Sequence, residues 1–175
     1  LRMESTNLYT FLVQGQEENN QNYHNWFPSL HGSYKFSPLF QLQAGYSRRV
    51  FRPRLWDLNP FFNIRNNFNI RQGNPNLQPE FTDSYELTGV IVLPQWSINS
   101  SIYHLFTTEV IERVTVFEDQ VAISMPRNLG QKSTTGLELN FKYYPVKWFS
   151  LNGDLNLGFF DRQGSFEGQN FDFNN

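Results

Sequence analysis

Polar and apolar side chains alternate along most of this chain with a period of two residues. The clearest case is segment 149–160, where Phe149, Leu151 and Leu155 fall on one face and Asn152 and Asp154 on the other. Because successive side chains of a β-strand point to opposite sides, this pattern predicts a strand with one apolar and one polar face. No segment has a convincing helical periodicity. We therefore predict an all-β chain of about seven strands, at 2–13, 26–36, 39–49, 81–93, 96–108, 134–144 and 149–160.

The connections between these strands alternate strictly between short and long. Tight turns are predicted at Ser37-Pro38, at Pro94-Gln95 and at 145–148, and long connections at 14–25, 50–80, 109–133 and from 161 onward. In an antiparallel up-and-down meander, this places every short turn at one end of the sheet and every long connection at the other. That asymmetry is typical of outer-membrane β-barrels.

Aromatic residues gather at the short-turn end of the predicted meander. An aromatic girdle at a membrane–water interface explains them, and we assign Trp96, Tyr143, Tyr144, Trp148 and Phe149 to it. The alternative is that aromatic residues flank hairpin turns in a soluble sheet. We favour the girdle because all three predicted hairpins show it.

Composition narrows the class of protein. Aromatic residues make up 17% of the chain although mean hydropathy is only -0.53, because apolar and polar positions are interleaved. No run of about 18 apolar residues predicts a transmembrane helix, but a membrane-spanning strand needs only about 9–11 residues. The net charge of -2 argues against nucleic acid as a partner. The chain has no cysteine for disulfide or thiolate chemistry.

Both termini have the sequence of interrupted elements. The first residues, Leu1-Arg2-Met3-Glu4, are unlike a signal peptide, and the last ones end in a polar stretch. Single-chain bacterial barrels close with an even number of strands, and an unpaired strand edge in lipid is costly. We therefore expect residues 1–175 to form a partial barrel domain, an open part of a large transmembrane β-barrel.

The segment 46–86 carries the most specific motif. Its centre reads Gly73-Asn74-Pro75-Asn76-Leu77-Gln78-Pro79-Glu80, and Ser84-Tyr85-Glu86-Leu87 follows in the next predicted strand. Pro75 and Pro79 exclude a central strand for 73–79, and Gly73-Asn74 supplies turn chemistry. The motif resembles that of TonB-dependent outer-membrane receptors, in particular the outer membrane protein β-barrel family. Weaker similarity extends over Val110–Arg113, Asn128–Gly130 and Gly136–Leu139.

This resemblance implies a large barrel in the outer membrane, filled by a plug domain and importing a scarce nutrient. The implied partners are outer-membrane lipid, a plug domain that we do not recognise in this chain, and the energy-coupling protein TonB. Siderophore, cobalamin, oligosaccharide and peptide all remain open as the nutrient.

A cluster of arginines precedes the motif. Arg48, Arg49, Arg52 and Arg54 are predicted to line the rim or the interior, and Glu80 is placed to pair with one of the first three. One interpretation is a solvated charge patch that holds a loop. The other is contact with an anionic ligand or with the plug, because the arginine fork suits carboxylate recognition.

The sequence contains no recognisable catalytic or metal-binding set. His24, His31 and His104 are far apart, and no phosphate loop or nucleophile elbow is present. We therefore expect no enzyme activity, no cofactor and no metal site.

Two alternatives to a transport receptor remain. A soluble carbohydrate-binding β-sandwich would use Trp26 and Trp56 for stacking and would bury the apolar face between two sheets. A non-transporting barrel such as an adhesin is disfavoured by the 46–86 motif. The barrel interpretation instead predicts that the apolar face is exposed, namely Leu137, Leu139, Phe141, Leu151, Leu155 and Leu157.

Overall fold

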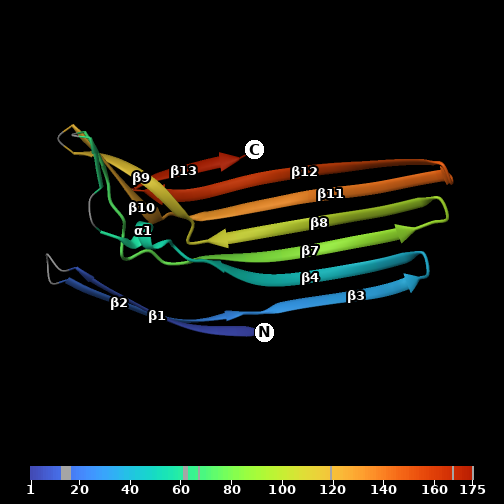
Figure 1. Cartoon of the computed structure of the whole chain (residues 1–175), viewed down its shortest axis with the longest axis horizontal. Helices are drawn as coiled ribbons and strands as arrows, with labels where there is room; N and C mark the ends of the chain where they lie inside the picture. The colour runs from blue at the N-terminus through green and yellow to red at the C-terminus, as the bar shows by residue number, and fades with distance from the viewer. Residues whose placement is uncertain (13–16, 61–62, 67, 119, 167, 175) are drawn as a thin grey trace.

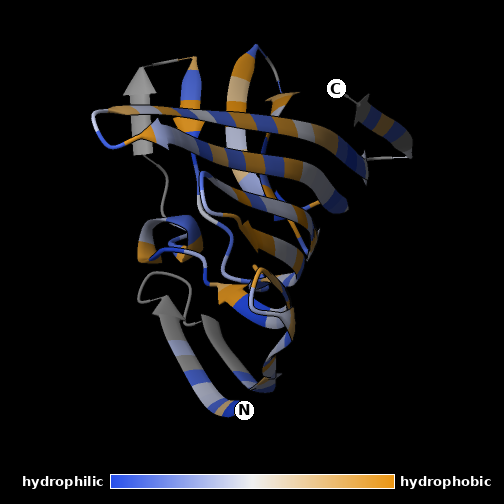
Figure 2. Ribbon diagram, turned by 90° about the vertical axis from the view of Figure 1, so that its right-hand side faces the viewer, coloured by the Kyte–Doolittle hydropathy of each residue, from blue (hydrophilic) through white to orange (hydrophobic). Residues whose placement is uncertain are grey.

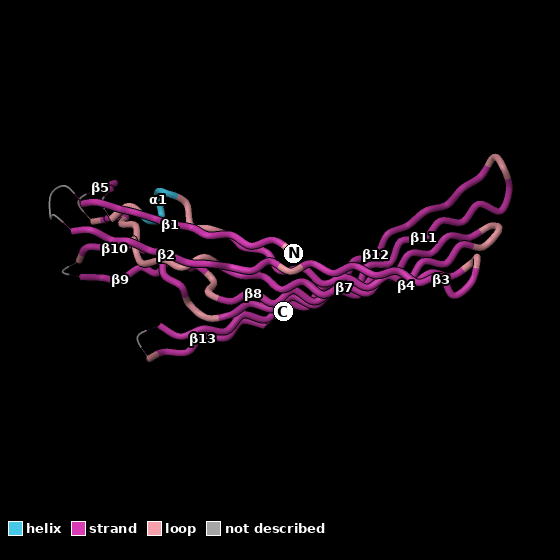
Figure 3. Tube along the Cα trace, turned by 90° about the horizontal axis from the view of Figure 1, so that it is seen from below, coloured by secondary structure: helices cyan, strands magenta, loops and turns pink. Residues whose placement is uncertain are grey.

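The computed structural model describes residues 1–12, 17–60, 63–66, 68–118, 120–166 and 168–174. Its main feature is a seven-stranded sheet with the order β13-β12-β11-β8-β7-β4-β3, in which all neighbours are antiparallel (Figure 1). The strands are β3 (Ser29–Ser37), β4 (Phe40–Phe51), β7 (Glu80–Val92), β8 (Trp96–Thr108), β11 (Gln131–Val146), β12 (Phe149–Phe166) and β13 (Gln169–Asn174). Figure 3 shows this sheet edge-on as one curved layer.

Two smaller sheets lie at the long-connection end of the molecule (Figure 1). The first pairs β1 (Arg2–Leu12) with β2 (Glu17–Phe27). The second has the order β5-β6-β10-β9 and consists of β5 (Asn63–Asn66), β6 (Asn69–Arg71), β9 (Ile111–Glu118) and β10 (Val121–Asn128). In it, β6 and β10 are parallel, and the other neighbours are antiparallel. A single helical turn, α1 (Leu55–Leu58), precedes β5.

The predicted all-β, antiparallel, open architecture is confirmed. The turns β3–β4, β7–β8 and β11–β12 all lie at one end of the sheet (Figure 1). Local hydrogen bonds account for two of them. The Ser37 Oγ atom accepts from the backbone N–H groups of Leu39 and Phe40 at 3.2 and 3.1 Å. Leu93 and Trp96 exchange backbone hydrogen bonds of 2.7 and 3.3 Å around the Pro94-Gln95 turn.

The predicted strand set and long connections need correction. Of the strand expected at 2–13, residues 2–12 form β1, and residue 13 lies outside the described residues. β1 pairs with β2 outside the seven-stranded sheet, where β13 is the seventh strand instead. The connections expected at 14–25, 50–80, 109–133 and from 161 onward contain β2, α1 with β5 and β6, the β9–β10 hairpin, and the end of β12 with β13. These segments lack clean alternation. A hairpin that contacts water on both faces does not require apolar residues on one face, so its strands leave no alternating pattern in the sequence.

The predicted start of a strand at residue 26 was also wrong, because residues 26 and 27 belong to β2 and β3 begins at Ser29. The chain is extended on both sides of Pro28, which is the only residue between the two strands. Proline has no N–H to donate, but the Pro28 carbonyl accepts from the Arg48 N–H at 3.0 Å. The prediction missed α1 because a single turn leaves no periodicity to detect. No helix in the part of the chain that the structure describes is long and apolar enough to cross a membrane.

The apolar face of the sheet is open, as the barrel interpretation predicts. Of the six residues that it names, Leu151, Leu155 and Leu157 on β12 are 50%, 48% and 48% exposed. Leu137, Leu139 and Phe141 on β11 are only partly exposed. Figure 2 shows hydrophobic and hydrophilic residues alternating along the strands. The β-sandwich alternative is therefore wrong, because it requires these residues to be sealed between two sheets.

The buried apolar side chains lie elsewhere, at the long-connection end. Among the described residues they are Phe27, Leu58, Leu77, Pro79, Val110 and Pro126. Most of the large apolar side chains are therefore exposed on the strands and turns, and few are buried in a core.

Candidate functional site: the two faces of the sheet and the loop-end hub

Strand register assembles the apolar face from rows of directly opposed residues. In antiparallel strands, opposed residues point to the same side of the sheet. One such row crosses five strands as Ala44, Leu87, Ile102, Leu137 and Leu157. The next row toward the short turns includes Leu42, Leu139 and Leu155. We call this side the apolar face.

An aromatic row bounds the apolar face at the short-turn end. Trp96 and Tyr143 are opposed, and their rings stack with centroids 4.0 Å apart. Of the other residues that we assigned to a girdle, Trp148 and Phe149 are exposed at the β11–β12 turn. Tyr144 follows Tyr143 directly, and its hydroxyl donates to the Leu93 carbonyl at 3.3 Å.

A second aromatic row bounds the apolar face at the other end, and we did not predict it. It runs through Tyr46, Tyr85, His104 and Phe159, with Thr135 between the last two. The Tyr46 and Tyr85 ring centroids are 5.0 Å apart. Along β8 the two aromatic rows are eight residues apart, from Trp96 to His104. At ~3.4 Å per residue and a strand tilt of ~40°, this corresponds to a height of roughly 21 Å, near the ~25 Å apolar band of outer-membrane barrels.

The opposite side of the sheet, the polar face, carries a hydrogen-bonded network. The Glu86 Oε1 atom accepts from the Thr88 hydroxyl at 3.0 Å and from the Ser101 hydroxyl at 3.1 Å. The two hydroxyls are 2.8 Å apart. Glu138 is opposed to Ser101 and therefore also lies on this face. The polar face thus presents carboxylates, hydroxyls and amides where the other side presents leucine.

Glycine lets one aromatic ring lie flat on the polar face. Tyr103 is opposed to Gly136, which is in turn opposed to Gly158. A Cβ atom at Gly136 would lie 2.3 Å from the Tyr103 Cζ atom, so the ring occupies the space that a side chain would need.

The 73–80 motif forms a compact structure that we call the loop-end hub, made of residues 73–80 with Asn59, Val110, Pro126 and Asn128. Leu77 is only 1% exposed. The Gly73 N–H donates to the Asn59 carbonyl at 2.9 Å, and a Cβ atom at Gly73 would lie 2.3 Å from that same oxygen. Only glycine therefore fits at this position without moving backbone.

Asn74 and Asn128 connect the two long connections within the hub. The Asn74 Oδ1 atom accepts from the Asn76 N–H at 2.9 Å, and its Nδ2 atom donates to the Pro126 carbonyl at 3.2 Å. The Asn128 Oδ1 atom accepts from the Gln78 N–H at 2.8 Å. Its Nδ2 atom donates to the carbonyls of Gln78 and Glu109 at 2.9 and 2.7 Å. The hub therefore holds residues 73–80 against β10.

Pro75, Pro79 and Glu80 complete the motif. Pro79 is buried, and Pro75 is partly buried. The Glu80 carboxylate accepts from the Ile111 N–H at 2.8 Å, at the start of β9. This is a different contact from the arginine pairing that we expected of Glu80.

The four arginines of the predicted cluster are not brought together on one surface. Arg48 lies just beyond the second aromatic row on the apolar face, 3.7 Å from the Asp83 carboxylate, which also accepts from the Tyr46 hydroxyl at 2.7 Å. Arg49 is exposed on the polar face. Arg52 forms an ion pair with Glu4. Arg54 is exposed and precedes α1.

Arg49 instead belongs to a polar row that the sequence did not reveal. This row crosses the polar face through Arg49, Thr82, Thr107, Lys132 and Arg162. The Thr82 and Thr107 hydroxyl oxygens are 2.9 Å apart. Arg162 forms an ion pair with Glu112. Three cationic side chains from three strands thus share one level of the polar face.

The described residues contain no group of three or more His, Asp or Glu side chains placed to hold a metal ion.

Comparison with solved structures identifies the same architecture in bacterial receptors. The siderophore receptor PirA from Pseudomonas aeruginosa is 21% identical with a TM-score of 0.64, over 85% of this chain and 33% of PirA. A mutant of the ferric enterobactin receptor PfeA from the same organism, in complex with enterobactin, is 16% identical with a TM-score of 0.65, over 83% of this chain and 27% of PfeA. The copper transporter OprC is 12% identical with a TM-score of 0.56, over 88% of this chain and 26% of OprC.

The chain therefore spans about a third or less of the receptors that it matches. A comparison of the sequence with curated proteins found no match. An open antiparallel sheet with one apolar face, two aromatic borders and one polar face is the wall of a transmembrane β-barrel. The chain belongs to the outer membrane protein beta-barrel family, whose model matches residues 1–175, and it resides in the outer membrane.

Proposed function

We propose that this chain is part of the barrel wall of a TonB-dependent receptor that takes up a scarce nutrient across the outer membrane. The observation that carries the proposal is the pair of opposed faces: an apolar face bordered by two aromatic rows, and a polar face with Glu86, Ser101 and Glu138. A wall of this kind separates lipid from a wet interior.

The nutrient and the partners follow by analogy with the similar proteins. A siderophore receptor, a ferric enterobactin receptor and a copper transporter share the fold. A ferric siderophore and copper are therefore the first nutrients to test. In this proposal a plug domain fills the interior against the polar face, TonB supplies the energy, and the chain catalyses no reaction.

The Arg49–Lys132–Arg162 row is the part of the wall that we assign to ligand or plug contact. Of the five residues expected from the sequence to contact a ligand or the plug, Arg48, Arg49, Arg52, Arg54 and Glu80, only Arg49 belongs to this row. The three side chains of this row lie on the polar face, where Arg162 also forms an ion pair with Glu112, whereas Arg48 lies on the apolar face. Arginine and lysine bind anionic groups by charge-assisted hydrogen bonds.

Uptake by cells that carry or lack the full-length gene tests the proposal. We expect deletion to abolish accumulation of one nutrient, supplied as a labelled ferric siderophore or as copper, and loss of TonB to have the same effect. The double variant Arg49→Ala/Lys132→Ala should reduce uptake, and the matched variant Arg48→Ala should not. Accumulation that persists without TonB would refute the transport assignment.

A further inference from the structure

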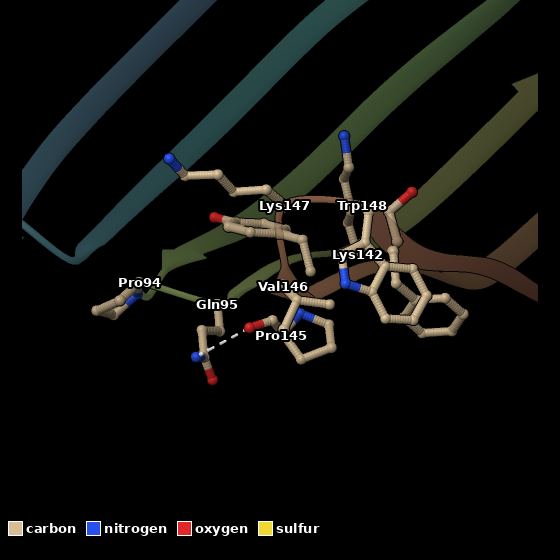
Figure 4. Close-up of a pocket in the computed structure, with 10 residues that line it drawn as sticks. Pro94, Gln95, Lys142, Pro145, Val146, Lys147 and Trp148 are labelled. Carbon is tan, nitrogen blue, oxygen red and sulfur yellow. Dashed lines mark hydrogen bonds between the residues drawn. The ribbon is translucent and has the colours of Figure 1, made fainter.

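Cationic side chains gather at both ends of the polar face. At the short-turn end, Lys142 and Lys147 line a hollow of about 690 Å³, and Figure 4 shows both side chains extending to the same side of the hairpin. The segments around the short turns, 33–43, 89–100 and 140–153, contain no acidic residue that could pair with them. At the loop end, by contrast, the cations lie beside a carboxylate of the same chain, and this contact indicates the kind of group that fits there.

The carboxylate at the loop end belongs to Glu112 on β9. It forms an ion pair with Arg162 on β12, and the two side chains are 30% and 27% exposed. Glu112 is opposed to Arg127 on β10, so both side chains point to the same side of the β9–β10 hairpin. The Arg127 guanidinium lies over the ring of Phe166 on β12, 5.3 Å from its centroid. One side of the hairpin therefore contacts β12 through a carboxylate and a cation.

Lys132 on β11 brings a third cation to the same place. It is opposed to Arg162 on the polar face, and its ammonium group lies 5.6 Å from the centroid of the Phe160 ring. Like charges that are directly opposed on neighbouring strands repel each other. Among the described residues, neither Lys132 nor Arg127 forms an ion pair. The three cations of β10, β11 and β12 therefore have one carboxylate partner between them, and two of them are held over aromatic rings of β12.

Glu112 satisfies the Arg162 guanidinium only in part. It pairs with the Nη2 atom, whereas the Nε atom is buried and has no hydrogen-bond partner in the part of the chain that the structure describes. A buried N–H group without a partner costs free energy. The Glu80 carboxylate, also at the start of β9, already accepts from the Ile111 N–H. An oxyanion placed along the side of the guanidinium could accept from Nε and Nη2 together, in the bidentate geometry that arginine favours.

We propose that these cations form a binding site for an oxyanion, which we call the three-cation site and which consists of Arg127, Lys132 and Arg162. Glu112 occupies the site until a ligand with two or more anionic groups takes its place. Such a ligand carries neighbouring carboxylates or phosphates, and its charge satisfies the cations that one carboxylate leaves unpaired. A singly charged anion gains little, because it only exchanges one carboxylate for another. Glu112 therefore makes the site selective for multiply charged ligands.

The inference deepens the proposed function and rests on its assignment of Lys132 and Arg162 to ligand contact. The ligand also ties the β9–β10 hairpin to the wall, because it bridges β10 and β12 as Glu112 bridges β9 and β12. Binding is measured on the purified full-length protein and requires neither TonB nor uptake. Cells without TonB-dependent uptake would therefore refute the proposed function without affecting this test.

Calorimetric titration of the full-length protein in detergent tests the inference with citrate, pyrophosphate and acetate at equal ionic strength. Citrate and pyrophosphate distinguish carboxylate from phosphate as the preferred group, and we expect at least one of them to bind more tightly than acetate. Glu112→Gln should raise the affinity for that anion about fivefold, since a partly exposed ion pair competes only weakly. Glu118→Gln removes the same charge from the same strand and should leave the affinity unchanged.

A double variant separates a ligand site from a purely structural ion pair. Arg162→Gln should weaken binding by about 10- to 100-fold, and adding Glu112→Gln should then bring no gain, because the competition requires Arg162. Without ligand, Glu112→Gln should also speed amide exchange in β9, and the bound anion should slow it again. A gain in affinity that persists without Arg162 would overturn the inference. So would acetate binding as tight as that of both other anions, or equal affinities in the wild-type protein and Glu112→Gln.

Discussion

Placing an arginine at the centre of the apolar face should destabilise the protein in a membrane. Leu139 lies in the middle of the five rows between and including the two aromatic borders, opposed to Leu155 and Ser100. Asn140 is its direct neighbour on the polar face at almost the same depth, opposed to Asp154 and Asn99. The pair Leu139→Arg and Asn140→Arg therefore changes only the side of the wall that receives the charge.

The expected magnitude follows from the depth of each position. Arginine on the lipid side costs ~2–4 kcal/mol at the bilayer midplane and ~0–1 kcal/mol near the interfaces. Leu139→Arg should therefore lower the folding equilibrium constant by about 30- to 900-fold. Asn140→Arg should have an effect within about 0.5 kcal/mol, as is usual for a solvated surface position. Phe159→Arg, in the second aromatic row, should cost little through membrane depth.

Urea unfolding of the full-length protein in lipid vesicles measures these differences. The midpoint and slope of the transition give the free energy of unfolding for each variant. Equal destabilisation by Leu139→Arg and Asn140→Arg would refute the assignment of the two faces. A larger effect at Phe159 than at Leu139 would refute the placement of the membrane midplane.

Two further predictions concern the loop-end hub. Gly73→Ala places a Cβ atom against the Asn59 backbone, so we expect residues 52–80 to become sensitive to limited proteolysis, whereas Gly32→Ala, which meets open space, should leave the digestion pattern unchanged. Asn128→Leu removes three hydrogen bonds to the exposed backbone of Gln78 and Glu109, which should lower the local opening free energy by about 1 kcal/mol. Faster amide exchange at Gln78 would support the second prediction, and unchanged exchange there would contradict it.

Sequence periodicity predicted the membrane-spanning part of the sheet well because lipid on one side and water on the other impose alternation. The position of the Pro94-Gln95 turn also determines which residues of β7 and β8 are opposed. Leu93 and Trp96 hydrogen-bond to each other, and the same spacing brings Tyr85 opposite His104. The second aromatic row was therefore accessible from the sequence once this register had been counted outward from the turn.

Beyond the second aromatic row, the sequence has no clear alternation of polar and apolar residues from which strands could be predicted. The β2 sequence, EENNQNYHNWF, is polar on both faces, so the chain stays extended with no alternation to reveal it. The hub was hidden for another reason. The Gly73–Glu80 motif predicted a turn, but the partners of Gln78 and Glu80 lie 50 and 31 residues away along the chain. Such distant pairings follow from the folded arrangement of two connections and leave no local pattern.

The side-chain amide of Asn128 has a consequence for how this wall can diversify. It meets both the N–H and the carbonyl of Gln78, which is what a neighbouring strand would do. A single side chain thus joins the two long connections by hydrogen bonds. The hairpins beyond it therefore do not have to match the register of the strands in the seven-stranded sheet. Their tips are free to lengthen, shorten or change in composition while the spanning strands keep their alignment.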